Sequence, residues 1–209
     1  LYAGTEYGLY ISMDDGLNWM AFQQNLPITP VTDLKINRGD LLISTMGRSF
    51  WILDDLSGLR QFSQPVAESK AWLFQPRDAV RMRYQGSRKG SIPEYPEPAA
   101  VIDYYLKDPA EGEIVLEIFN AKKELIRSFS SHKKPGEPRD EEPDMATGIR
   151  TIQVAGQLST SPGLHRFHWD MRHQGPWDKD AKESDKSGPV AAPGLYAINL
   201  TVNGQSLVQ

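Results

Sequence analysis

The stretch Ser12-Met13-Asp14-Asp15-Gly16-Leu17-Asn18-Trp19 decides how the first part of the chain folds. β-forming residues precede it directly, at 8–12. Residues 14–16 have the chemistry of a tight turn, because aspartate accepts local backbone hydrogen bonds and glycine readily adopts a positive φ. Trp19 follows at the start of a returning strand, where we expect it to pack back against the turn. The stretch therefore predicts a β-hairpin.

Short strand patterns continue on both sides of this hairpin. Apolar and polar residues alternate at 31–36, as in a half-buried strand, and Pro27 and Pro30 mark the loop before it. Strands are predicted at 1–5, 8–12, 19–22, 31–36, 41–45 and 49–53. So many antiparallel strands in about 55 residues are typical of one propeller blade and a little more.

A single blade cannot bury both of its faces. Six apolar residues of these strands nevertheless need burial: Leu9, Ile11, Leu34, Ile36, Leu41 and Ile43. Either further blades cover them or the sheet packs on the second half of the chain. A capped helical turn is predicted at 54–61, with Asp54 or Asp55 as the cap.

The second half has the pattern of a β-sandwich. Strands are predicted at 72–74, 79–84, 100–106, 114–120, 125–129, 163–170 and 193–202. Leu164, Phe167 and Trp169 are the expected core residues of one of these strands. Asn203-Gly204 is a strong signal for a two-residue hairpin turn. Strands separated by turns at this spacing are typical of an all-β sandwich.

We therefore predict an all-β chain with three parts. A terminal blade occupies 1–62, a polar linker with leading strands occupies 63–98, and a sandwich occupies 99–209. Long insertions at 132–162, with a short helix around 145–154, and at 172–190 are expected to be surface loops.

Composition excludes several functional classes. The chain has 209 residues, a net charge of −4 and an isoelectric point near 5.6, which argues against a nucleic-acid-binding surface. No apolar run approaches the roughly 20 residues of a membrane span. Cysteine is absent, which excludes disulfide and thiolate chemistry but does not fix the compartment.

The first 60 residues resemble the final blade of bacterial BNR/Asp-box proteins, a sortilin-like propeller family often labelled glycosyl hydrolase. The resemblance rests on residues 4–10, 26–27, 30–34 and 47–55, and on the Asp-box residues Ser12, Asp14, Gly16, Asn18 and Trp19. Asn18 stands where the motif usually has threonine. The family usually has histidine before Gly47-Arg48, where this chain has Met46, so no role of that histidine is carried over.

The second half resembles the Ig-like, fibronectin-like domain of flagellar hook-capping proteins and of secreted bacterial enzymes. Four short segments carry this resemblance: Ala121-Lys122, Gly163, Trp169-Asp170 and Pro193-Gly194-Leu195-Tyr196. It implies a β-sandwich that serves as an accessory module.

Paired carboxylates are the first candidates for chemistry. A glycosidase needs two carboxylates about 5 to 10 Å apart across a sugar. Adjacent residues of an extended chain point to opposite faces, so neither Asp14 with Asp15 nor Asp54 with Asp55 forms such a site alone. We predict no catalytic residue in this chain. Arg48 either faces a propeller channel or forms a structural ion pair.

Metal and sugar sites are the remaining candidates. His165 and His168 lie three apart on a predicted strand and face opposite sides, which does not chelate a metal. The acidic run at 178–185 lacks the glycine and the terminal glutamate of a calcium loop. We predict no metal and no cofactor.

Aromatic residues can instead stack on a sugar. Tyr104, Tyr105, Trp169 and Trp177 form a sugar platform or pack in the core, and core packing is favoured for Trp169. Trp177 lies in a polar loop and is the best candidate for exposure. Trp51 and Trp177, together with Arg48, are the residues predicted to face a channel or a ligand.

The chain opens directly in a strand pattern, without Met or a signal segment. We expect the C-terminal part of a longer, exported bacterial protein, in which a non-catalytic module braces the propeller or binds a glycan or protein. Two alternatives stay open: part of a glycoside hydrolase whose active site lies mainly in upstream blades, and a protein-interaction module of a sortilin-like ectodomain. Expected partners are the upstream blades, the glycan or protein ligand, and a second copy bound at an open edge within 1–55.

Overall fold

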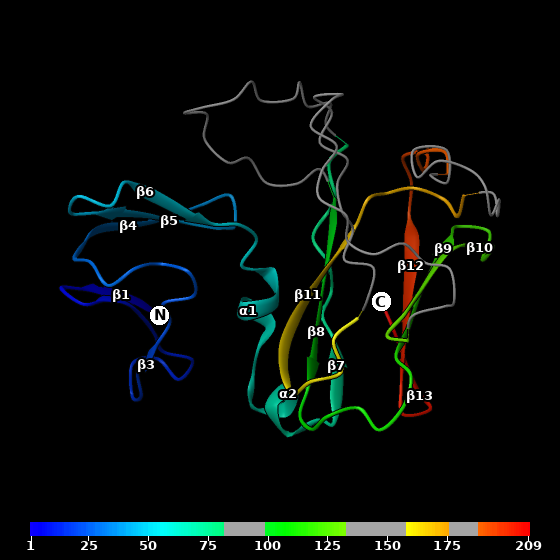
Figure 1. The fold of residues 1–209 in the computed structure, drawn as a ribbon, viewed down its shortest axis with the longest axis horizontal. Coiled ribbons are helices and arrows are strands. Elements are labelled where there is room, and N and C mark those ends of the chain that lie inside the picture. Colours follow the sequence, from blue (N-terminus) through cyan, green and yellow to red (C-terminus); the bar gives the residue numbers. More distant parts are fainter. Residues whose placement is uncertain (82–98, 133–157, 176–187) are drawn as a thin grey trace. The chain divides into compact units, whose positions relative to one another are not determined.

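A computed structural model describes residues 1–81, 99–132, 158–175 and 188–209. The chain divides into two compact units, Leu1–Ala67 and Glu68–Gln209. The described part is all-β, with antiparallel sheets and two five-residue helices (Figure 1). The all-β prediction is therefore confirmed.

The first unit contains all six predicted strands, but they form two separate three-stranded sheets rather than one continuous sheet. The first sheet holds β1 (Tyr2–Thr5), β2 (Gly8–Ile11) and β3 (Met20–Ala21), and the second holds β4 (Val31–Asn37), β5 (Asp40–Thr45) and β6 (Phe50–Leu53). Pro27 and Pro30 lie between β3 and β4 and have no backbone N–H for a ladder, so the chain leaves one sheet before it enters the next.

A small core holds the first unit together. Its buried members are Leu9, Leu26, Leu41, Ile43 and Leu56. Ile11 is also buried as predicted, but Ile36 is 48% exposed, so the prediction that it is buried is wrong. Ile36 lies opposite Leu41 in the β4–β5 register, at the rim of an open cleft described below.

Two short helices follow β6. α1 (Ser57–Gln61) has Leu56 at its N-cap position, and the Asp55 carboxylate accepts a hydrogen bond from the Ser57 N–H at 3.0 Å. The polar linker predicted after it is in fact helical over α2 (Gln64–Glu68). Pro65 suits a first helical turn, and Val66, which is 2% exposed, provides the buried anchor.

The second unit has two antiparallel sheets around one core, an arrangement that fits a β-sandwich (Figure 1). One sheet has the order β11-β8-β7, from Gly163–Trp169, Ala100–Leu106 and Ala71–Leu73. The other has the order β10-β9-β12-β13, from Leu125–Ser130, Val115–Asn120, Tyr196–Val202 and Gln205–Val208. The predicted Asn203-Gly204 hairpin joins β12 to β13, with φ of 48° and 78° at its two residues.

Of the three β11 side chains predicted to be buried in the core, two are buried and one is not. Phe167 and Trp169 are 2% and 4% exposed, whereas Leu164 is 41% exposed. Side chains of a strand alternate between its faces, so a residue three positions before Phe167 lies on the other side of the sheet. Leu164 therefore pairs with Tyr105 on the outer face.

One predicted strand is contradicted at its start, and several other predicted segments lie outside the described residues. Residues 79–81 are not in a strand, which contradicts the start of the strand predicted at 79–84, and 82–84 lie outside the described residues. The short helix predicted around 145–154, the acidic run at 178–185 and Trp177 also lie outside them.

Candidate functional site

The Asp14 turn, residues 12–19, is held together by local hydrogen bonds of its polar side chains. Ser12 is buried, at 2% exposure, and its hydroxyl donates to Asp14 Oδ1 at 2.9 Å. The same hydroxyl oxygen accepts from the Gly16 N–H at 2.8 Å. Ser12 therefore joins the end of β2 to both sides of the turn.

The Asp14 carboxylate closes the other half of this turn. Its Oδ1 accepts from the Asn18 backbone N–H at 2.8 Å, and its Oδ2 accepts from the Asn18 side-chain amide at 2.6 Å. Asn18 thus supplies two donors at the position where the motif usually has threonine. Trp19 Nε1 donates to the Gly16 carbonyl at 3.1 Å, and Gly16 has the predicted positive φ, 94°.

These bonds determine what Asp14 can do chemically. Hydrogen bonds from the Asn18 backbone, the Asn18 side chain and Ser12 lower the pKa of the Asp14 carboxyl. A carboxylate held ionised and engaged at both oxygens is a poor general acid. The geometry gives Asp14 the role of a turn residue.

Arg48 and Trp51 meet through the backbone of the β5–β6 connection. Trp51 packs against the core of the first unit, and its Nε1 donates to the Arg48 carbonyl oxygen at 2.7 Å. The Arg48 side chain is exposed and forms no ion pair with any of the described residues. Of the residues predicted to face a channel or ligand, Arg48 is exposed, Trp51 is partly buried, and Trp177 lies outside the described ranges.

The aspartates at the end of β6 are also used locally. Asp55 is 7% exposed, and besides binding the Ser57 N–H it donates its own N–H to Asp40 Oδ1 at 2.9 Å. Its φ is 53°, a left-handed conformation that aspartate tolerates better than most residues. Asp55 therefore helps turn the chain from β6 into α1.

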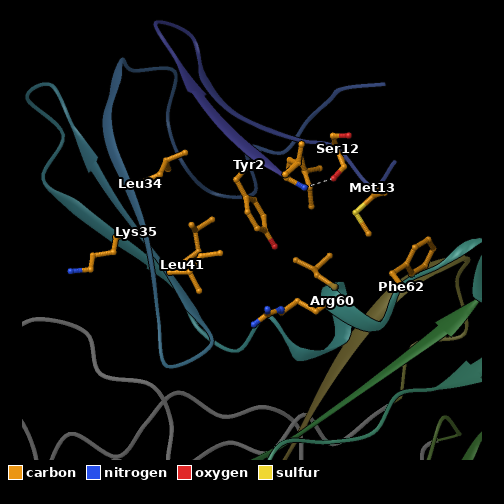
Figure 2. A pocket seen from close by; sticks show the side chains of 12 residues that line it. Tyr2, Ser12, Met13, Leu34, Lys35, Leu41, Arg60 and Phe62 are labelled. Atoms are coloured by element: carbon orange, nitrogen blue, oxygen red, sulfur yellow. Dashed lines mark hydrogen bonds between the residues drawn. The ribbon is translucent and has the colours of Figure 1, made fainter. Parts of the chain in front are cut away.

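A cleft of about 600 Å³ opens within the first unit, between its two sheets and α1. Its lining has apolar side chains, among them Ile11, Leu41, Leu59 and Phe62, and polar ones, among them Ser12 and Arg60. Figure 2 shows the Tyr2 ring projecting into this space, while the Lys35 side chain points away from it. Burial raises the pKa of the Tyr2 hydroxyl, and the Arg60 charge partly offsets that rise.

Sequence reasoning did not identify this cleft. Tyr2 and Arg60 lie far apart in the chain, and neither belongs to a motif. The strand pattern at 1–5 was the only available signal, and it does not say which side chain faces the second sheet.

The aromatic residues of the second unit serve its core. Tyr104 is 1% exposed and donates its hydroxyl hydrogen to the Ser159 carbonyl at 2.8 Å; burial raises its pKa to about 12. Trp169 Nε1 donates to the Arg172 carbonyl at 3.0 Å. Core packing of Trp169 is confirmed, and neither ring is available to stack on a sugar.

The described residues contain no group of three or more His, Asp or Glu side chains suited to hold a metal ion. His165 and His168 pair with Tyr104 and Val101, on opposite faces of the sheet as predicted. None of the described helices has the length and apolar character needed to cross a membrane.

No protein-family model matches the chain, and no curated protein or solved structure is significantly similar to it.

Proposed function

We propose that this chain is a non-catalytic module of an exported Asp-box propeller protein, which braces neighbouring blades and binds a glycan or protein ligand. The Asp14 turn carries this proposal. Its serine, aspartate, asparagine and tryptophan bond to one another or to backbone groups of the same turn. Side chains committed in this way shape a hairpin, and the Asp14 carboxylate is not available as a free acid for hydrolysis.

The two sheets of the first unit support the bracing role. Each is a three-stranded antiparallel sheet, one strand short of a complete four-stranded blade. Phe50 and Ile52, at 84% and 58% exposure, lie on the face of the second sheet opposite the core. Such a sheet face gains stability when a neighbouring sheet covers it.

The cleft is the proposed ligand position. Its lining combines apolar side chains with the Arg60 guanidinium and with the hydroxyl-bearing residues Tyr2 and Ser12. This chemistry suits a ligand that has an apolar face and an acidic group, such as an acidic sugar or a peptide carboxylate.

Two measurements on the whole chain test the proposal. No aryl glycoside should be hydrolysed, and titration calorimetry with acidic oligosaccharides and carboxylate peptides should detect binding that Arg60→Ala weakens about tenfold. Lys107→Ala, an exposed cation of the second unit, is the control and should leave binding unchanged. Turnover abolished by a point mutation of the chain would instead favour the glycoside hydrolase alternative.

A further inference from the structure

The outer face of the β11-β8-β7 sheet carries a row of large side chains. Trp72 of β7 pairs with Tyr105 of β8, and Tyr105 pairs with Leu164 of β11. Directly opposed residues of antiparallel strands have Cβ atoms about 5 Å apart, so the three side chains form one row across the sheet. Trp72 and Leu164 are 37% and 41% exposed, and Tyr105 is half-buried. The neighbours of Trp72 and Tyr105 along their strands belong to the core, so the row lies on the opposite face.

Trp72 differs from the other tryptophans that the structure describes. Trp19, Trp51 and Trp169 each donate the indole N–H to a backbone carbonyl oxygen, at distances between 2.7 and 3.1 Å. Within the described ranges, by contrast, the Trp72 indole N–H has no acceptor and its ring has no aromatic partner. Trp72 therefore offers both an open ring and a hydrogen-bond donor on the outer face of the sheet.

The row beside Trp72, Tyr105 and Leu164 holds an ion pair. Arg166 pairs with Asp103 in the strand register, two residues along from Leu164 and Tyr105 and therefore on the same face. The guanidinium holds both oxygens of the Asp103 carboxylate at 2.9 Å, and the Arg166 side chain is 31% exposed. The two charges cancel, so this pair favours a neutral ligand over an acidic one.

The size of the row favours a small ligand. Two strand spacings give a width of about 10 Å, and three side chains offer far less surface than the roughly 1,000 Å² that a specific protein interface buries. An aromatic ring with a polar tip suits a ligand that has an apolar face and hydroxyl groups around its edge. Pyranose rings whose hydroxyl groups are all equatorial have this shape, because C–H bonds cover both faces of the ring.

We infer that Trp72 and Tyr105 form a stacking platform for a neutral glycan of β-linked glucose or a related all-equatorial sugar. A sugar ring packs its C–H face on the Trp72 ring, and the indole N–H donates to a hydroxyl group at the edge of the sugar. Leu164 extends the apolar surface beyond Tyr105. The platform belongs to the second unit, and the inference does not rest on the cleft or on its acidic ligand.

Nitrogen-15 NMR of the 209-residue chain, titrated with cellotetraose to about 10 mM, tests this inference. The Trp72 indole N–H signal, assigned by its loss in Trp72→Phe, should shift as the sugar binds. The indole signals of Trp19, Trp51 and Trp169 should stay in place, because their N–H groups already have acceptors within the protein. A Trp72 signal that does not move overturns the inference.

Variants test the platform through the backbone signals of β7. Trp72→Ala should weaken cellotetraose binding about tenfold, and Trp72→Phe, which keeps a ring but removes the N–H, should weaken it less. Leu125→Ala is the matched control, because Leu125 is 52% exposed in the second unit but lies on the other sheet. Circular dichroism confirms that each variant folds. Binding that Trp72→Ala leaves unchanged overturns the inference, as does a Trp72 shift caused by an apolar peptide but not by the sugar.

Arg60→Ala separates the platform from the cleft. It should leave cellotetraose binding unchanged, since Arg60 belongs to the first unit. Loss of cellotetraose binding in Arg60→Ala would place the sugar in the cleft and overturn the platform. Failure of acidic ligands to bind at Arg60 would contradict the proposed ligand position in the cleft and leave the platform standing.

Discussion

The two units differ in how completely they bury their apolar residues. Among the described residues, 18 buried residues form the core of the second unit, with contributions from both sheets, whereas five form that of the first. Conversely, 11 of the large apolar residues exposed in the described ranges belong to the first unit and six to the longer second one. Because apolar burial is the main stabilising term in folding, stability should reside chiefly in the second unit.

Truncation of a core residue should give the largest contrast. Leu200 is fully buried in the second unit, so Leu200→Ala should lower the free energy of unfolding by about 2–5 kcal/mol. Ile52→Ala, in the exposed face of the first unit, should change it by about 0.5 kcal/mol or less. Scanning calorimetry with hydrogen exchange assigns each loss to its unit. Equal losses would contradict the comparison.

Loss of the ion pair in the second unit should have a smaller effect. Arg166 holds the carboxylate of Asp103 with two bonds of 2.9 Å, and Asp103 is 4% exposed. Arg166→Ala leaves this buried charge without those bonds and should cost about 1–3 kcal/mol in urea denaturation. Adding Asp103→Leu should recover much of the loss. No recovery would show that Arg166 contributes through packing alone.

The contribution of Tyr104 to the stability of the second unit should depend on pH. Tyr104→Phe removes the bond to Ser159 and should cost about 0.5–1.5 kcal/mol at neutral pH. The folded-state pKa of about 12 lies above the ordinary value of 10.0, so the wild type keeps its stability below pH 10.0 and loses it as pH rises toward 12. Urea denaturation of both proteins across this range should show that the variant lacks the loss. Parallel curves would contradict the assignment.

The Asp14 turn should give the smallest effect, because it is exposed and local. Asp14→Ala should lower the melting temperature of the first unit by a few degrees, whereas Asp15→Asn, which keeps a residue tolerant of the positive φ of 56°, should not. The lowered pKa of Asp14 makes its contribution present above pH 3.8 and lost as pH falls through the folded value. An effect that persists at lower pH would argue against the carboxylate as its source.

Sequence patterns predicted the features that depend on neighbouring residues. The Asp14 turn and the Asn203-Gly204 hairpin follow from the chemistry of a few consecutive residues, and most strands follow from alternation. The separation of the first unit into two sheets was missed, although Pro27 and Pro30 already interrupted the pattern. The α2 helix was missed because Val66 is the buried anchor of an otherwise polar segment.

Features that depend on distant residues could not be predicted. The cleft forms where Tyr2 of β1 meets Arg60 of α1, and no local pattern links them. The exposure of Leu164 depends on which face of β11 meets the other sheet, and a strand shifted by one residue reverses that choice.

The hydrogen bonds of the Asp14 turn join residues no more than four positions apart. Contacts this local require little loop closure, and hairpins of this kind form in about 1–10 μs. The turn can therefore form while β1, β4 and β5 are still unpaired. It would then set the direction of β3 against β2 before the slower, long-range pairing of the second sheet begins.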